Sequence, residues 1–255
     1  MPKQTTDIDS ISQRFNAGAL RYDTYAQIQH QVVDDFSLFL GSSLKQARQI
    51  IDLGCGTGGL LSKCCELADA ASLIGVDISS SMLDELVARA VLAEPVLASM
   101  ENTGLTSGVF DWVLSTSALQ WADVEQAIAE MSRLCSSDGV IAISWFSETT
   151  LGAWRQLWGG EFFELPSKPK VIKELCRHGF QIRKSQSKLY LDQKTSFDHA
   201  VRSVNGIGAG KSSSQRRRIS RSQYDSAKNG FELKVNQSGY FSMEYPTEFL
   251  LASRS

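Results

Sequence analysis

The stretch "IIDLGCGTGGL", Ile50 to Leu60, decides the fold of this 255-residue chain. Its apolar run ends in Asp52 and gives way to four glycines within six residues. Glycine adopts the positive φ angles that a tight turn requires, and other residues rarely do. The pattern therefore predicts a strand, a tight turn and the start of a helix, with backbone N–H groups exposed toward a small molecule.

Strand-like and helix-like segments alternate on both sides of this turn, from about residue 49 to residue 146. The apolar runs "QIIDLG", "SLIGVD", "PVLAS", "FDWVLSTSAL" and "GVIAISWF" predict strands. Amphipathic segments such as "VEQAIAEMSRLC" separate them and predict helices. This alternation is typical of βαβ units and predicts a doubly wound, mainly parallel α/β sheet, whose ligand lies beyond the carboxyl ends of the strands.

We expect one domain, 1–255, built in four parts. A helical lid occupies about 1–45, where "YAQIQHQVVDDFSLFL" has an apolar helical stripe, and the cofactor-binding core occupies 46–146. A helical cap over the substrate is expected to be inserted at 147–210. A basic connection and C-terminal strands, "GFELKVN" and "EFLLASR", complete the chain at 211–255.

Composition indicates an ordinary soluble globular protein with a sizeable core. Hydrophobic residues make up 42% of the chain, charged residues 21%, and the net charge is −2, so nothing favours nucleic acid or a membrane as partner. We find no signal peptide or membrane span in the sequence. The five cysteines are odd in number and lack a C-x-x-C pair, which indicates reduced thiols in a cytoplasm and no metal site.

The glycines fit two cofactors. Gly54, Gly56 and Gly59 spell the G-x-G-x-x-G of a dinucleotide-binding turn, whereas Gly54, Gly56 and Gly58 spell the loop that receives S-adenosylmethionine. About 20 residues further on, Asp77 ends the next apolar run, and a carboxylate there can accept both ribose hydroxyls of an adenosine. The loop and Asp77 together indicate a nucleoside cofactor.

Charge favours S-adenosylmethionine over a dinucleotide. A pyrophosphate binds at the helix N-terminus, and an acidic side chain just before the turn works against it. S-adenosylmethionine carries an ammonium group and a sulfonium, which Asp52 can stabilise while backbone N–H groups receive the cofactor's carboxylate. Charge alone does not exclude a dinucleotide as the cofactor.

Longer motifs resemble a known class. "IIDLGCGTG", "LIGVDISSSML" and "FDWVLSTSALQWADVEQAIAEMSRLCSSDGVIAISWF" together resemble class I S-adenosylmethionine-dependent methyltransferases. "SALQW" is similar to the biotin-pathway malonyl-acyl-carrier-protein O-methyltransferases and to the trans-aconitate methyltransferases. The segments "ISQRFNAGALRYDTYAQIQ", "TTLGAWRQLW" and "VRSVNGIGAG" favour the first group, so the resemblance runs from about Ile11 to Gly210.

The resemblance implies that S-adenosylmethionine is the cofactor and implies a set of residues that contact it. Ser99 stands where the family usually has an acidic residue that would meet the adenine amino group, and a serine hydroxyl accepts that hydrogen bond more weakly. The expected cofactor-binding residues are Asp52, Gly54, Cys55, Gly56, Gly58, Asp77, Ile78, Ser99, Met100 and Ser115.

The resemblance further implies esterification of the free carboxylate of malonyl-acyl carrier protein (or malonyl-CoA), an early step toward pimelate and biotin. A carboxyl with a pKa near or below about 4 is already ionised at neutral pH, so no general base is required. We expect Tyr22 to cover the cofactor and Gln120 and Trp121 to line the methyl-transfer site. Arg155 or Arg202 is the expected bidentate partner of the malonyl carboxylate.

Acyl carrier proteins are acidic, so the docking face is expected to be basic. The candidates are Lys168, Lys170, Lys173 and Arg177 in one cluster and Lys211, Arg216, Arg217, Arg218 and Arg221 in a second. We expect a monomer.

Three alternatives remain. A methyltransferase of a free small acid of the trans-aconitate type needs no docking face. An RNA methyltransferase suits the arginines, but the N/D-P-P-Y/F type of signature is missing and the net charge is negative. A non-catalytic binding protein would lack cofactor affinity or a closed site, and the presence of Asp52, the glycines and Asp77 gives that alternative little support.

Overall fold

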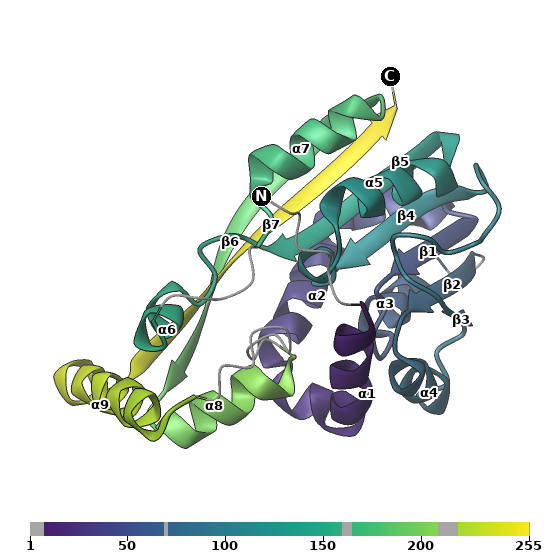
Figure 1. The fold of residues 1–255 in the computed structure, drawn as a ribbon. Coiled ribbons are helices and arrows are strands. Elements are labelled where there is room, and N and C mark those ends of the chain that lie inside the picture. Colours follow the sequence, from purple (N-terminus) through teal and green to yellow (C-terminus); the bar gives the residue numbers. More distant parts are fainter. Residues whose placement is uncertain (1–7, 69–70, 160–164, 209–218, 255) are drawn as a thin grey trace.

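The computed structural model describes residues 8–68, 71–159, 165–208 and 219–254. Seven strands form one sheet in the order β3-β2-β1-β4-β5-β7-β6 (Figure 1). The strands are β1 (Gln49–Leu53), β2 (Ser72–Asp77), β3 (Glu94–Leu97), β4 (Phe110–Thr116), β5 (Cys135–Phe146), β6 (Phe180–Lys194) and β7 (Phe241–Arg254). β1, β2, β3, β4 and β5 pair in parallel, and β7 runs antiparallel to both of its neighbours. The predicted doubly wound α/β sheet is confirmed.

Helices cover both faces of the sheet. Neighbouring residues of each central strand point to opposite faces, so both sets of side chains are buried. In β1, Ile50 belongs to the apolar cluster beneath α2 (Gln27–Leu40) and α3 (Gly59–Leu67). Ile51 belongs to the cluster beneath α5 (Val124–Leu134) on the other face. Burial on both sides explains why these strands are near-continuous apolar runs in the sequence.

The N-terminal segment is helical, as predicted. α1 (Ile8–Tyr25) and α2 follow one another, and the short 3-10 helix η1 (Gly41–Gln46) leads into β1. α1 packs against α4 (Ser80–Ala88) and α8 (Phe197–Gly206), whereas α2 lies on the sheet (Figure 1). This arrangement places α1 beside the β2–α4 connection, at the carboxyl end of β2.

The predicted cap contains helices, but 147–210 does not form one unit. α7 (Lys168–Arg177) packs beside α5, and β6 is an edge strand of the main sheet, so both belong to the core. α6 (Gly152–Leu157) and α8 lie instead with α9 (Arg221–Ser238) near one end of the antiparallel strand pair β6–β7 (Figure 1). An aromatic cluster joins these three helices to the strand pair: Trp154, Trp158, Phe197, Tyr224, Phe231 and Phe241.

The strand predicted at "GFELKVN" is wrong, because this segment lies inside α9. Phe231 and Ala227 are buried four residues apart on one face of the helix, and Leu233 is exposed. The Ser220 side chain begins the helix with a capping box that includes Gln223. The alternation of Phe, Leu and Val in the sequence is the two-residue period of a strand, which is why a strand is expected. The helix instead places Ala227 and Phe231 on one face, against the aromatic cluster.

No helix in the described part of the chain is both long enough and apolar enough to cross a membrane.

Candidate functional site

The glycine loop joins β1 to α3 and has the backbone that its sequence predicts. Gly54, Gly56 and Gly58 all have positive φ angles, +76°, +53° and +84°. A Cβ on Gly54 would lie 2.3 Å from the Cβ of Ala118, so a side chain there collides with the β4 connection. A Cβ on Gly56 would meet nothing within 4 Å. The loop therefore approaches the end of β4 closely at Gly54 and leaves open space at Gly56.

Gly59 distinguishes the dinucleotide-binding motif from the S-adenosylmethionine-binding motif. It is the first residue of α3 and does not have a positive φ, and a Cβ there would make an ordinary 3.8 Å contact with Val33. Gly58, in contrast, is the left-handed residue at the N-cap of α3. The glycines that this turn requires are Gly54, Gly56 and Gly58, which is the S-adenosylmethionine spelling.

Asp77 at the end of β2 faces the same turn. Its carboxylate accepts hydrogen bonds from Gly56 N and Ser79 N, each at 2.9 Å, which fixes its position relative to the loop. Burial raises the pKa of Asp77, and these backbone bonds oppose the rise. Each oxygen keeps a further lone pair, so the carboxylate can still accept two ribose hydroxyls.

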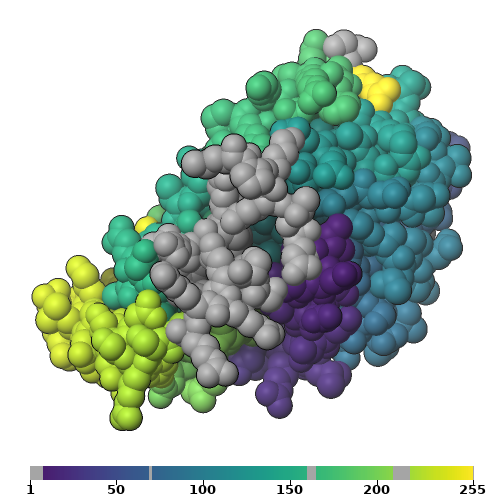
Figure 2. Space-filling model, in the orientation of Figure 1, coloured from purple at the N-terminus to yellow at the C-terminus, as the bar shows by residue number. Residues whose placement is uncertain are grey.

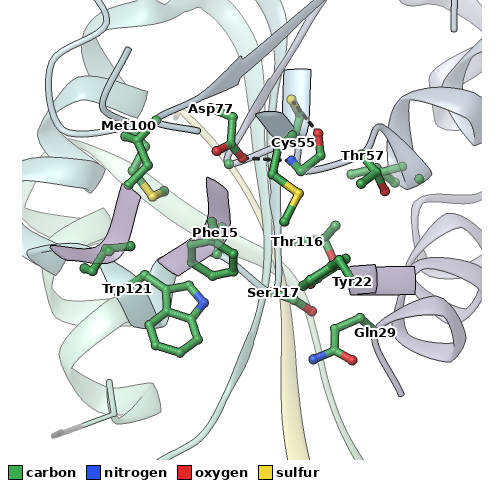
Figure 3. A pocket seen from close by; sticks show the side chains of 18 of the residues that line it. Phe15, Tyr22, Gln29, Cys55, Thr57, Asp77, Met100, Thr116, Ser117 and Trp121 are labelled. Carbon is green, nitrogen blue, oxygen red and sulfur yellow. Dashed lines mark hydrogen bonds between the residues drawn. The ribbon is translucent and has the colours of Figure 1, made fainter. Parts of the chain in front are cut away.

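These residues line a cavity (Figure 3). Seven of the ten predicted cofactor-binding residues line it: Gly54, Cys55, Gly56, Asp77, Ile78, Ser99 and Met100. Tyr22 and Trp121 line it as well. The cavity lies beyond the carboxyl ends of the strands, which is where a doubly wound sheet binds its ligand.

Asp52 does not line this cavity. Its side chain is fully buried in β1, and within the described part of the chain neither carboxylate oxygen has a hydrogen-bond partner. Burial raises the pKa of Asp52 to about 7, and the negative charge of Asp77 adds to the rise. An uncompensated buried carboxyl group beside the glycine loop suits a cationic ligand. Direct contact between Asp52 and the ligand stays a prediction.

Two further predicted cofactor-binding residues do not line the cavity, so their contact with the cofactor stays a prediction. Ser115 is fully buried and does not line the cavity, because its hydroxyl donates to Leu53 O at 2.8 Å and ties β4 to β1. Gly58 also does not line the cavity, since the space beside it is filled by Leu86 and Val91. Its contribution is the left-handed turn that starts α3.

A second cavity adjoins the first. Four residues line both cavities: Tyr22, Gln29, Ser117 and Trp121. The other lining residues are Gln120, Phe146, Thr150, Leu151, Arg155, Leu165, Ile207 and Tyr245. The structure therefore brings together the predicted Tyr22, Gln120, Trp121 and Arg155.

Arg155 is the one cationic residue among the described residues that line the second cavity. It extends from α6, and its Nη1 donates to Glu148 O at 2.9 Å. Arg202, the other predicted carboxylate partner, lies exposed on α8 and lines neither cavity, so its contact with the substrate stays a prediction.

The side chains between the two cavities are polar but uncharged. Burial, with a contribution from the charge of Asp77, raises the pKa of Tyr22, so its hydroxyl keeps its proton at neutral pH. Gln120 Nε2 donates to Ser117 O at 2.6 Å. Residue 117 itself has a positive φ of 53°, which is rare outside glycine and marks a strained backbone.

α1 is bonded to the cofactor side of the site. Asn16 Oδ1 accepts from Ser79 Oγ at 2.7 Å and from Ser81 N at 3.2 Å, while Ser12 Oγ donates to Ile78 O at 2.9 Å. Phe15 reaches across to Trp121, with ring centroids 5.5 Å apart.

A second set of bonds joins the end of α1 to its surroundings through Asp23. This carboxylate accepts from Thr57 Oγ1 at 3.2 Å, lies 3.1 Å from His30 Nε2 and forms an ion pair with Arg89. α1 is thus bonded to α2, the glycine loop and α4.

Sequence reasoning missed several lining residues, among them Phe15, Gln29, Thr57 and Ser117. One signal was available. Gln29 interrupts the buried stripe of α2, whose other buried members are apolar (Ile28, Val32, Phe36, Phe39 and Leu40). Burying an amide without a hydrogen bond costs free energy, so a single buried glutamine in such a stripe indicates a polar contact or a ligand.

The first basic cluster lies on α7. Lys168 pairs with Glu248 at 2.8 Å and Arg177 with Glu174 at 3.3 Å, whereas Lys170 and Lys173 are exposed. In the second cluster, Arg221 is the exposed first residue of α9. Lys211, Arg216, Arg217 and Arg218 lie outside the described residues.

Comparison with known proteins agrees with this geometry. A family model described as a methyltransferase domain matches residues 51–143. The malonyl-[acyl-carrier protein] O-methyltransferase of Geobacter sulfurreducens is 28% identical, with 81% of this chain and 83% of the relative covered. The enzyme of the same name from Herminiimonas arsenicoxydans is 26% identical over 98% of each chain.

Among solved structures, magnesium protoporphyrin IX methyltransferase from Synechocystis PCC 6803 has the same fold. It superposes with a TM-score of 0.65 at 17% identity, covering 98% of this chain and all of the other.

The matched domain, the three required glycines and Asp77 define the class of the site: residues 51–143 match a methyltransferase domain, the fold is that of S-adenosylmethionine-dependent methyltransferases, and S-adenosylmethionine is the cofactor. Within that class, it resembles the malonyl-[acyl-carrier protein] O-methyltransferases over most of its length.

Proposed function

We propose that the protein methylates the free carboxylate of a malonyl group carried on acyl carrier protein, an early step of pimelate and biotin synthesis. Two relatives that align over more than four fifths of the chain have this name. The proposal places the enzyme in the cytoplasm, acting as a monomer on malonyl-acyl carrier protein or malonyl-CoA.

The observation that carries the proposal is the second cavity with Arg155 in its lining. A guanidinium recognises a carboxylate with two parallel hydrogen bonds. The cavity adjoins the cofactor cavity and is otherwise lined by uncharged residues, so a small acid entering it has one cationic partner among the described residues.

The residues fit the reaction. Bound S-adenosylmethionine supplies a methyl group on a positively charged sulfur. Asp77 would hold the ribose of that cofactor and the backbone of the glycine loop its carboxylate, and the uncharged Tyr22, Ser117 and Trp121 lie where the two cavities meet. Uncharged donors orient a carboxylate without neutralising the oxygen that attacks, and such orientation is worth roughly 7–11 kcal/mol.

The test is transfer of labelled methyl from S-adenosylmethionine to malonyl-acyl carrier protein, with malonyl-CoA and trans-aconitate assayed beside it. We expect a methyl ester on the malonyl thioesters, and Arg155→Met should raise KM for them without loss of fold. Labelling of trans-aconitate alone supports the free-acid alternative. If no malonyl thioester is methylated, the proposal is wrong.

A further inference from the structure

Gln29 is a buried side chain of α2 with an unexplained amide. It is 7% exposed and lines both cavities. Its Oε1, which can only accept a hydrogen bond, is buried and has no partner in the described part of the chain, so the atom of Gln29 that can donate to a ligand is the amide nitrogen Nε2. In Figure 3, Gln29 lies below Tyr22 and Ser117, which line the same two cavities.

Ser117 has the second unpartnered group at this junction. Its Oγ is buried and has no partner among the described residues, while the backbone there has the strained positive φ. The residue is anchored by its own N–H, which donates to Ser144 O at 2.9 Å, and by its carbonyl, which accepts from Gln120. A fixed, strained position that presents an unused hydroxyl is typical of a functional site.

We propose that Gln29 and Ser117 hold the substrate carboxylate where the two cavities meet, by donating hydrogen bonds to the oxygen that is not methylated. This inference rests on the proposed function, because it assigns the partners of the reacting carboxylate. Both are neutral donors, so they fix the carboxylate and leave the negative charge on the attacking oxygen.

The location supports this division of labour with Arg155. Gln29 and Ser117 line both cavities, whereas Arg155 lines the substrate cavity alone. A carboxylate centred on Arg155 would be strongly neutralised, but one held by an amide and a hydroxyl at the junction remains reactive toward the cofactor. A malonyl thioester has one free malonyl carboxylate, so Arg155 binds this group as the acid enters the second cavity, and Gln29 and Ser117 hold it at the junction where it reacts.

The test uses Gln29→Glu, which keeps the shape but replaces the donor by a carboxylate, and Gln29→Leu, which removes all polarity. Gln31→Glu is the matched control, since Gln31 is exposed on the same helix. Ser117→Ala tests the hydroxyl. For each variant we measure kcat and KM with malonyl-acyl carrier protein, the Kd of S-adenosylhomocysteine by calorimetry and the melting temperature.

We expect kcat/KM to fall by about 10- to 100-fold in the three site variants, with Gln29→Glu the lowest, and to stay unchanged in Gln31→Glu. The Kd of S-adenosylhomocysteine and the melting temperature should stay near wild type, which a purely structural role for Gln29 would not allow. A loss of S-adenosylhomocysteine affinity equal to the loss of kcat/KM overturns the proposal, because Gln29 then serves the cofactor.

Failure of the proposed function is a separate result. If the wild-type protein methylates no malonyl thioester, we measure binding of malonate and of trans-aconitate to protein saturated with S-adenosylhomocysteine. Weaker binding of either acid by Gln29→Glu supports the inference for a different acid substrate. Equal binding by wild type and variant, or no binding by wild type, overturns it.

Discussion

Asp52 is a carboxyl group that the fold places in an unfavourable position. It is fully buried in the central strand and has no hydrogen-bond partner in the described part of the chain. Desolvation and the charge of Asp77 raise its pKa to about 7, so the unliganded protein at neutral pH holds this group partly protonated. A cation bound beside it would favour the ionised form.

The raised pKa predicts the direction of a pH effect on stability. From about pH 4 to pH 7 the folded protein binds more protons at Asp52 than the unfolded chain does, because the unfolded pKa is near 3.8. The free energy of unfolding therefore falls as the pH rises through this range, by at most about 4 kcal/mol, and levels off above it. Asp52→Asn should flatten this dependence and weaken S-adenosylhomocysteine binding by about tenfold or more.

Thermal and denaturant unfolding of both proteins between pH 5 and pH 8.5, without and with S-adenosylhomocysteine, measures the two effects. Asp84→Asn is the control, since Asp84 is exposed on α4. Identical slopes for wild type and Asp52→Asn would show that Asp52 does not titrate in this range.

The residues that could be predicted are those whose role is local. Gly54, Gly56 and Gly58 shape a turn within five residues of chain, and their spacing in the sequence is enough to identify it. Gln29 and Ser117 lie far apart in the chain and meet only because α2 lies on the sheet beside the end of β4. Arg155 and Arg202 both lie on segments predicted to be helical. The packing of α6 and α8 decides that Arg155, and not Arg202, lines the second cavity.

At the level of elements, α1 closes the cofactor side of the site through hydrogen bonds from Asn16 to the β2–α4 connection. We expect Asn16→Ala to raise the Kd of S-adenosylhomocysteine by about 5- to 50-fold, since two hydrogen bonds near the cavity are lost. The dissociation rate should carry most of the change, because the bonds hold the helix in its closed position.

Stopped-flow release of S-adenosylhomocysteine measures that rate. Gln13→Ala is the control on the same helix, with an exposed side chain. A dissociation rate that is the same in Asn16→Ala and wild type would mean that α1 does not retain the ligand.

Helices and strands could be predicted where apolar residues repeat with one clear spacing. They could not be predicted where a strand-like and a helix-like spacing occur in the same segment. The parallel strands are long apolar runs because both faces are buried. In α9, Phe231, Leu233 and Val235 alternate like a strand, yet the helical spacing of Tyr224, Ala227 and Phe231 decides the structure because it faces the aromatic cluster. The range 147–210 looked like one insertion because β6 pairs only with β7, far along the chain.

On the scale of the whole molecule, the distribution of charge decides where an acidic carrier protein could dock. The chain has a net charge of −2, so an acidic partner gains no attraction from the molecule as a whole. The exposed Lys170 and Lys173 lie on α7, a few residues after Leu165, which lines the second cavity. A carrier protein docked on α7 would thus lie next to the cavity that we propose for its malonyl group.

We therefore expect the double variant Lys170→Glu and Lys173→Glu to lower kcat/KM for malonyl-acyl carrier protein by about tenfold or more at low salt. Malonyl-CoA, which brings no protein surface, should be methylated at the wild-type rate. The difference between variant and wild type should shrink as salt screens the interaction.

The matched control is Lys45→Glu with Lys234→Glu, which makes the same change in net charge at exposed positions away from α7. Lys234 lies on α9, at the other end of the molecule from α7 (Figure 2). If net charge alone governs the encounter, the control loses as much activity as the α7 variant. An equal loss with malonyl-CoA would place the effect in the site rather than in docking, whereas a loss confined to the α7 variant and the carrier protein identifies α7 as the docking face.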